Sequence, residues 1–125
     1  MMKAERTTGF RHLWKATGYS LAGLRDMLGE TAFRHELLCG LVEVPAAWLL
    51  PGLTLEWRLL LTLVWLSMLA METVNTAIEA VVDLASPERH PLARKAKDLG
   101  SCAVFFAIIA NVLAWSCAVW RLCAR

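Results

Sequence analysis

The stretch WRLLLTLVWLSMLAMETVNTAIEAVVDL, residues 57–84, decides the fold class. Its first half is almost entirely apolar, and the whole segment exceeds the roughly 20 residues that a helix needs to cross a hydrocarbon core. Polar residues enter its second half in a regular series: Glu72, Asn75, Glu79 and Asp83. We therefore predict a membrane-spanning helix over 57–84 whose surplus length projects into the headgroup region or beyond.

The composition of the chain is that of a membrane protein. Of its 125 residues, 58% are hydrophobic and 19% are charged, whereas a soluble domain of this length usually carries more charge. The length allows one domain, the net charge of +2 is too small to indicate a nucleic-acid partner, and the N-terminus lacks the apolar run of a signal peptide. No C-x-x-C spacing suggests zinc, so we expect small core residues at Cys39, Cys102, Cys117 and Cys123.

Three further segments are predicted to be helical. Residues 9–28 alternate apolar and basic side chains at helical spacing, as in a helix that lies in the membrane interface, although packing on a protein core is the alternative. Residues 33–50 form a weak candidate span, because Glu36 and Glu43 interrupt it and Pro45 would kink it. Residues 99–122 form a third span, apolar apart from Asn111 and small residues, and the charged, proline-containing stretch SPERHPLARK, residues 86–95, is predicted to be a loop.

The predicted fold is thus an all-α membrane protein, with an N-terminal amphipathic interfacial helix and three transmembrane helices. Basic residues set its orientation, because cytoplasmic segments are enriched in lysine and arginine. The turn between the first two spans offers only Arg58, and the C-terminus only Arg121 and Arg125. We predict a cytoplasmic N-terminus and a cytoplasmic 85–98 loop, because ten basic residues lie there: Lys3, Arg6, Arg11, Lys15, Arg25, Arg34, Arg89, Arg94, Lys95 and Lys97.

The four polar residues of the second span form one stripe. At about 100° per residue they fall within roughly a quarter of the helix circumference, at its cytoplasmic end. Glu30 and Glu36 flank the cytoplasmic start of the first span, and Lys97 and Asp98 open the third. Charges at a membrane boundary are costly unless they are paired, hydrated or bound to cations, so we predict a functional site. Asp83 or Glu88 alone would suit a solvated helix end, but Glu72 has apolar neighbours on both sides.

The residue types fit phosphoryl transfer. Carboxylates suit Mg²⁺, which commonly bridges one or two of them to phosphate oxygens, a lysine suits a phosphate, and a further carboxylate could deprotonate a substrate hydroxyl. The chain contains no G-x-x-x-x-G-K-[ST] loop, kinase glycine loop, H-R-D or D-F-G element. An ion or proton transporter would use similar residues, so the residue types alone leave that alternative open.

Short motifs recur over nearly the whole chain: TTGF (7–10), GYS (18–20), GLR (23–25), AFR (32–34), AIEAVVD (77–83) and RKAKDLGSCAV (94–104). With the E-x-x-N-x-x-x-E stripe, Glu72 to Glu79, they resemble the prokaryotic diacylglycerol kinase family of small integral membrane kinases. The stripe is highly specific to that family when A-K-D follows a loop. It implies a homotrimer in the bacterial inner membrane with sites shared between protomers, and Mg-ATP-dependent conversion of diacylglycerol to phosphatidic acid. Related members phosphorylate undecaprenol instead, and spacing does not separate the two substrates.

The resemblance also implies roles for single residues. Glu72 would be the catalytic base, with Asn75 and Lys97 as the other catalytic residues, and Glu30 and Glu79 would hold the metal. ATP would be bound by His12, Tyr19, Glu30, Glu79, Asp83, Glu88, Arg89, His90, Lys97 and Asp98. The lipid would be bound by Arg34, Glu36, Trp48, Glu72 and Ser101.

The chain departs from the family pattern in three places. The ATP-contacting arginine of the family aligns with His12, next to Arg11. The segment from Gly23 to Glu30 is one residue shorter, which would rotate Glu30 relative to the stripe. Glu43 and Pro45, inside the first span, have no counterpart that explains them.

Overall fold

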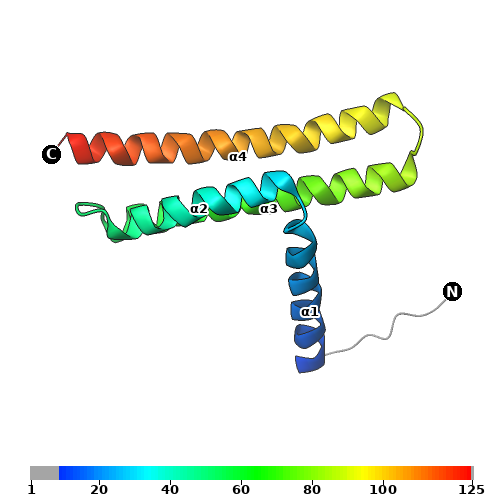
Figure 1. The fold of residues 1–125 in the computed structure, drawn as a ribbon, viewed down its shortest axis with the longest axis horizontal. Coiled ribbons are helices and arrows are strands. Elements are labelled where there is room, and N and C mark those ends of the chain that lie inside the picture. Colours follow the sequence, from blue (N-terminus) through cyan, green and yellow to red (C-terminus); the bar gives the residue numbers. More distant parts are fainter. Residues whose placement is uncertain (1–8, 125) are drawn as a thin grey trace.

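The computed structural model describes residues 9–124, so Lys3, Arg6, the start of the TTGF motif and Arg125 lie outside the described residues. It contains four helices, α1 (Phe10–Met27), α2 (Thr31–Leu49), α3 (Leu55–Ala85) and α4 (Pro91–Cys123). α2, α3 and α4 run side by side, α3 packs against both of the others, and α1 projects away from them (Figure 1). The predicted all-α class is confirmed, since the described part of the chain contains no strand.

Two of these helices, α3 and α4, are long and apolar enough to cross a membrane. Within the described residues α2 does not meet that test, because it carries Arg34, Glu36 and Glu43 along a shorter apolar sequence. The hydropathy of the chain therefore establishes two candidate spans, and a third span through α2 remains a proposal.

The prediction that residues 86–95 form a loop is wrong at its second half. The loop covers only residues 86–90, and α4 begins at Pro91. Proline is well tolerated at the first helical position, where its missing N–H would have no intrahelical partner. His90 caps the helix, because its Nδ1 accepts a hydrogen bond from the backbone N–H of Leu92 at 3.2 Å. Lys97 and Asp98 therefore sit inside α4 rather than at its start.

Arg58 closes the opposite end of the molecule, at the turn between α2 and α3. Its guanidinium donates hydrogen bonds to the carbonyl oxygens of Leu53 at 3.1 Å, Leu50 at 3.5 Å and Trp48. The last carbonyls of a helix have no intrahelical donor, and a cation is favourable near them. Arg58 thus stabilises the end of α2 and the chain reversal that follows it.

α2 approaches α3 closely at Gly40. A Cβ atom at this position would lie 2.1 Å from the ring of Trp65, so only glycine allows the two helices to pack here. The Trp65 Nε1–H donates to the backbone oxygen of Glu36 at 3.0 Å. The buried residues of α2 recur at helical spacing on one face: Phe33, Glu36, Gly40 and Ala47.

A small apolar core lies near the turn between α2 and α3, where Ala47, Leu53, Leu61 and Ala118 are buried together. Large apolar side chains elsewhere are exposed, for example Leu84 at 86% and Trp120 at 76%. The expectation that the four cysteines are core residues is wrong for the single chain, because all four are exposed. Such extended apolar surface is stable against lipid or against other protomers rather than against water.

Candidate active site

The polar stripe of α3 runs from the interior of the helix bundle to its end. Glu72 and Asn75 are buried, at 7% and 9% exposure, whereas Glu79 is half-buried and Asp83 is exposed. Asn75 Nδ2 donates to Glu79 Oε1 at 3.1 Å, so two members of the stripe are directly linked. Glu72 is therefore the member of the stripe most withdrawn from water.

Gly100 of α4 makes the position of Asn75 possible. A Cβ atom at Gly100 would lie 2.3 Å from Asn75 Oδ1, so any larger residue would displace the amide. The Oδ1 atom is buried without a hydrogen-bond partner, and its close approach to the Gly100 backbone gives it at most a weak C–H···O contact. Because Oδ1 faces α4, the Nδ2 group of the amide faces Glu79. The sequence pattern alone does not single out Gly100, although it lies only two residues after Asp98.

Three further carboxylates lie around Glu72. Glu36 of α2 is buried at 8% exposure, and its Oε2 atom has no hydrogen-bond partner. Glu36 interacts electrostatically with Glu72, and Glu72 in turn interacts with Glu79 and with Glu30, the residue that precedes α2. Residues far apart in the sequence thus meet at one depth. Carboxylates gathered in one region favour the binding of a cation.

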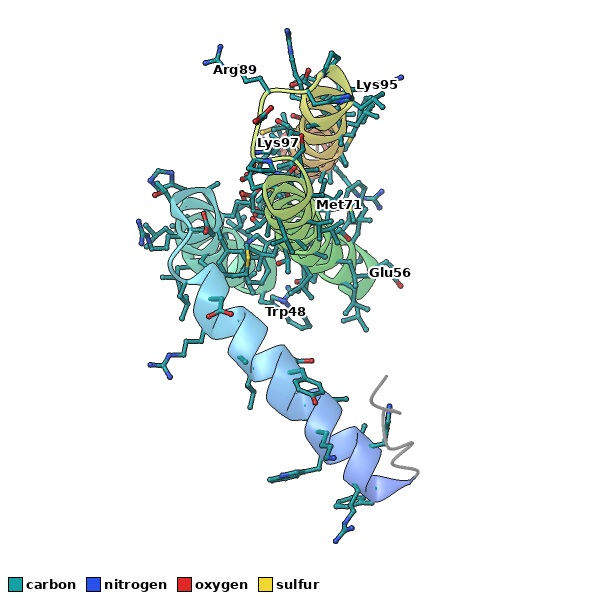
Figure 2. The ribbon with its side chains drawn as sticks, turned by 90° about the vertical axis from the view of Figure 1, so that its right-hand side faces the viewer. Trp48, Glu56, Met71, Arg89, Lys95 and Lys97 are labelled. Carbon is teal, nitrogen blue, oxygen red and sulfur yellow. The ribbon has the colours of Figure 1, made fainter. Side chains whose placement is uncertain are left out.

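A cleft of about 920 Å³ lies beside the stripe, where α3 turns into α4. Lys97 reaches across from α4 to α3 and pairs with Asp83, with Nζ and Oδ1 2.6 Å apart. Lys97 lies between the two helices, whereas Lys95 lies on the outer side of α4 (Figure 2). The lining residues include Asp83, Glu88, Arg89, His90, Lys97 and Asp98. All six are residues for which the resemblance implies nucleotide binding.

The charges around this cleft suit a polyphosphate. Four basic side chains line it, Arg89, Arg94, Lys95 and Lys97, together with the N-terminus of α4. A helix N-terminus carries partial positive charge and unpaired N–H groups, which favour anions. Arg94 forms an exposed pair with Asp98 at 3.5 Å, and the sequence analysis had not assigned it or Lys95 to a site. Their position in a basic cluster beside the A-K-D motif is the sequence feature that could have predicted a role for Arg94 and Lys95 in the site.

Other predicted site residues lie elsewhere in the single chain. His12 and Tyr19 are exposed on α1, which projects away from the α3–α4 cleft (Figure 1). Arg34 braces the turn between α1 and α2, because its guanidinium donates to the Gly29 carbonyl at 3.2 Å and to Thr31 Oγ1 at 3.2 Å. Trp48 lies at the α2–α3 turn and donates to Thr62 Oγ1 at 3.1 Å. Ser101 is exposed on α4, next to Gly100.

Comparison with known proteins identifies the family of the chain. The family described as "Prokaryotic diacylglycerol kinase" matches residues 18–119. The chain belongs to the prokaryotic diacylglycerol kinase family. It is 46% identical over 110 residues to a diacylglycerol kinase of Pseudomonas aeruginosa, covering 87% of this chain and 89% of that protein. It is 44% identical over 118 residues to a diacylglycerol kinase of Escherichia coli strain K12, covering 94% and 96%.

The match to the family also includes α2, whose hydropathy alone does not identify it as a membrane span. A diacylglycerol kinase of Sinorhizobium is 43% identical over 107 residues, with coverage of 86% of this chain and 77% of the relative. The stripe on α3, the cleft and α2 all lie within the residues that the family matches. The prokaryotic diacylglycerol kinase family is a family of phosphotransferases that act on an alcohol group, so this chain is an enzyme of that class.

Proposed function

We propose that this protein transfers the γ-phosphoryl group of ATP to the hydroxyl of diacylglycerol at the cytoplasmic membrane surface, producing phosphatidic acid. One observation carries the proposal: a cleft of about 920 Å³, lined by four basic and three acidic side chains, lies at the end of the same helix that buries the carboxylate of Glu72. Donor and acceptor would therefore approach the stripe from opposite directions. ATP would come from the aqueous end of α3, and the lipid would come from the membrane.

The transfer would be direct and in line, with no covalent enzyme intermediate. Glu72 would accept the proton of the lipid hydroxyl as that oxygen attacks the γ-phosphorus. Glu36, whose Oε2 has no partner and which interacts electrostatically with Glu72, would contact the glycerol backbone of the lipid and help to place its hydroxyl. Lys97 would leave Asp83 to contact the phosphate that is transferred. Positioning and charge stabilisation would supply most of the rate.

The acidic residues fit Mg²⁺ bound together with a nucleotide. Among the described residues, no group of three His, Cys, Asp or Glu side chains could hold a metal by itself. Mg²⁺ commonly uses one or two carboxylates and completes its coordination with water and phosphate oxygens. Glu79 and Glu30, both within electrostatic reach of Glu72, would be those ligands. The ion would offset the negative charge on the β- and γ-phosphates.

Removing one metal ligand should change the magnesium dependence of the reaction. We expect Glu79→Gln to raise the Mg²⁺ concentration that gives half-maximal activity and to lower the maximum rate, and Glu30→Gln to do the same if the shorter segment before it leaves it in place. Magnesium titrations at saturating ATP and lipid measure both quantities. Glu56→Gln, in the exposed first turn of α3 at the end away from the cleft, removes an equal charge and serves as the control. An unchanged midpoint and rate in Glu79→Gln would exclude that residue as a ligand.

The same family membership supports a homotrimer of three-span protomers in the bacterial inner membrane. α1, which carries the exposed His12 and Tyr19, projects away from the other helices of its own chain (Figure 1), and sites shared between protomers would bring these residues to a neighbour's nucleotide. We propose that the N-terminus and the loop between α3 and α4 are cytoplasmic and that the C-terminus is outside. Reporter fusions after Arg125 and within 86–90 test this orientation, and two reporters on one side would contradict it.

A lipid phosphorylation assay tests the function itself. The purified protein in mixed micelles is given Mg-ATP with either diacylglycerol or undecaprenol, and labelled phosphate in each lipid is counted. We expect transfer to diacylglycerol. Preferential transfer to undecaprenol would reassign the substrate within the family. ATP consumption independent of either lipid, or none at all, would contradict a lipid kinase.

A further inference from the structure

Glu43, a carboxylate inside α2, accepts three hydrogen bonds from α4. Asn111 Nδ2 lies 3.1 Å from Oε1 and 2.9 Å from Oε2, and Trp115 Nε1 lies 3.3 Å from Oε2. Glu43 follows Glu36 by two helical turns, so it lies roughly 10 Å further along α2, away from the cytoplasmic end. A carboxylate at such depth is costly, and its partners are expected to matter.

This cluster is the polar link between α2 and α4. α3 packs against both helices, whereas α2 and α4 share few direct contacts. Within residues 9–124, every hydrogen bond that joins α2 to α4 ends on Glu43. The position of α2 relative to α4 therefore depends on this side chain, in addition to packing on α3 and the apolar core that Ala47 and Ala118 share near the α2–α3 turn.

The link also fixes the rotation of α2 about its axis. Glu43 and Glu36 lie on the same face of α2, because seven residues make almost two full turns. Pro45, close by, lacks the N–H that would bond to the Leu41 carbonyl, which weakens the helix beside Glu43. The rotation that brings Glu43 to Asn111 is the rotation that brings Glu36 to Glu72.

We propose that Glu43 is a positioning residue for the lipid end of the active site. By holding α2 against α4 inside the membrane, it keeps Glu36 beside Glu72, where the lipid hydroxyl would bind. This inference rests on the proposed function, in which Glu36 and Glu72 contact the lipid. It also gives a reason for the carboxylate that the sequence analysis left unexplained.

A pair of variants separates positioning from stability. Glu43→Leu alone would leave the buried Asn111 without its acceptor, which is destabilising in its own right. Glu43→Leu combined with Asn111→Leu removes the acceptor together with its main donor, so that only the longer bond from Trp115 Nε1, 3.3 Å, is lost without a replacement. Replacing paired buried polar groups by apolar ones is often neutral for stability. Glu43→Gln keeps an acceptor for Asn111 Nδ2 and adds a donor for Asn111 Oδ1, which has no partner. Ser116→Ala is the control, because Ser116 bonds only within α4, to the Val112 carbonyl.

The kinetic test compares those variants whose thermal unfolding midpoint equals that of the parent. We expect Glu43→Leu/Asn111→Leu to keep its KM for ATP but to lose roughly 10- to 100-fold in kcat/KM for the lipid, since small misplacements at a reacting centre have effects of that order. Glu43→Gln and Ser116→Ala should behave like the parent. Normal lipid kinetics in the double variant, or equal losses toward ATP and lipid, would overturn the proposal. A loss in Glu43→Gln would show that the charge, not the link, is required.

A second measurement does not depend on catalysis. Cysteines introduced as Glu36→Cys and Glu72→Cys, in a chain whose four native cysteines are replaced by alanine, are treated with a short bifunctional thiol reagent. We expect efficient cross-linking with Glu43 present and a clear loss of cross-linking in the Glu43→Leu/Asn111→Leu background. Equal cross-linking in both backgrounds would overturn the inference even if the parent phosphorylated no lipid, and an inactive parent with the expected cross-linking difference would contradict only the proposed function.

Discussion

Replacing Glu72 by glutamine is expected to lower kcat by roughly 10²–10⁴, the usual contribution of a general base. The substitution keeps the shape of a side chain that is 7% exposed, and it removes a negative charge that lies close to Glu36, Glu79 and Glu30. The variant should therefore fold at least as well as the parent and bind nucleotide normally. Lipid phosphorylation at saturating ATP and lipid measures the rate, and equilibrium binding of a non-hydrolysable nucleotide measures the affinity.

Glu56→Gln provides the matched control for that experiment. Glu56 lies in the first turn of the same helix and is exposed, at the end away from the cleft (Figure 2). The same chemical change there should leave kcat unaltered. If Glu72→Gln kept near-normal turnover, another group would have to take the proton. Glu36, which is also buried, would be the first candidate, and Glu36→Gln would then be the variant that loses kcat.

Local patterns in the sequence were sufficient to predict that the polar stripe lies on one face of a helix. Glu72, Asn75, Glu79 and Asp83 belong to one helix, and on a helix the spacing alone determines which residues share a face. The same holds for the first half of the predicted loop between α3 and α4, residues 86–90, which the structure confirms as a loop. The structure accordingly places Asp83, Glu88 and Lys97 around one cleft, as their proximity in the chain had suggested.

Contacts between helices were not accessible in the same way. No periodicity indicates that Gly100 must be small because Asn75 occupies the adjoining space, or that Glu43 will meet Asn111, which lies 68 positions further along the chain. The extent of α4 was also missed, because Pro91 was taken to mark a loop although proline fits the first turn of a helix. The cysteines were misplaced for a related reason, since an apolar sequence in a membrane protein can face lipid as well as a core.

Lys97 is the second residue whose removal should have a large effect. We expect Lys97→Met to lower kcat by roughly 10²–10³, the range found when one preorganised charge or donor is removed from a transition state, and to raise the KM for ATP. Its pair with Asp83 is short at 2.6 Å, but the two side chains are 37% and 66% exposed. Such a pair contributes about 0–1 kcal/mol to stability, so unfolding would not explain the loss.

The control for Lys97 lies on the same helix. Lys95 lines the same cleft but projects from the outer side of α4 (Figure 2), so Lys95→Met removes an equal charge without removing the group between α3 and α4. We expect a small rise in the KM for ATP and an unchanged kcat, because a charge at the rim attracts the nucleotide without touching the phosphate that moves. Equal losses of kcat in both variants would mean that the cleft contributes only its overall positive potential, and the transferred phosphate would then have to lie away from Lys97. A normal kcat in Lys97→Met would exclude a direct contact between Lys97 and the transferred phosphate.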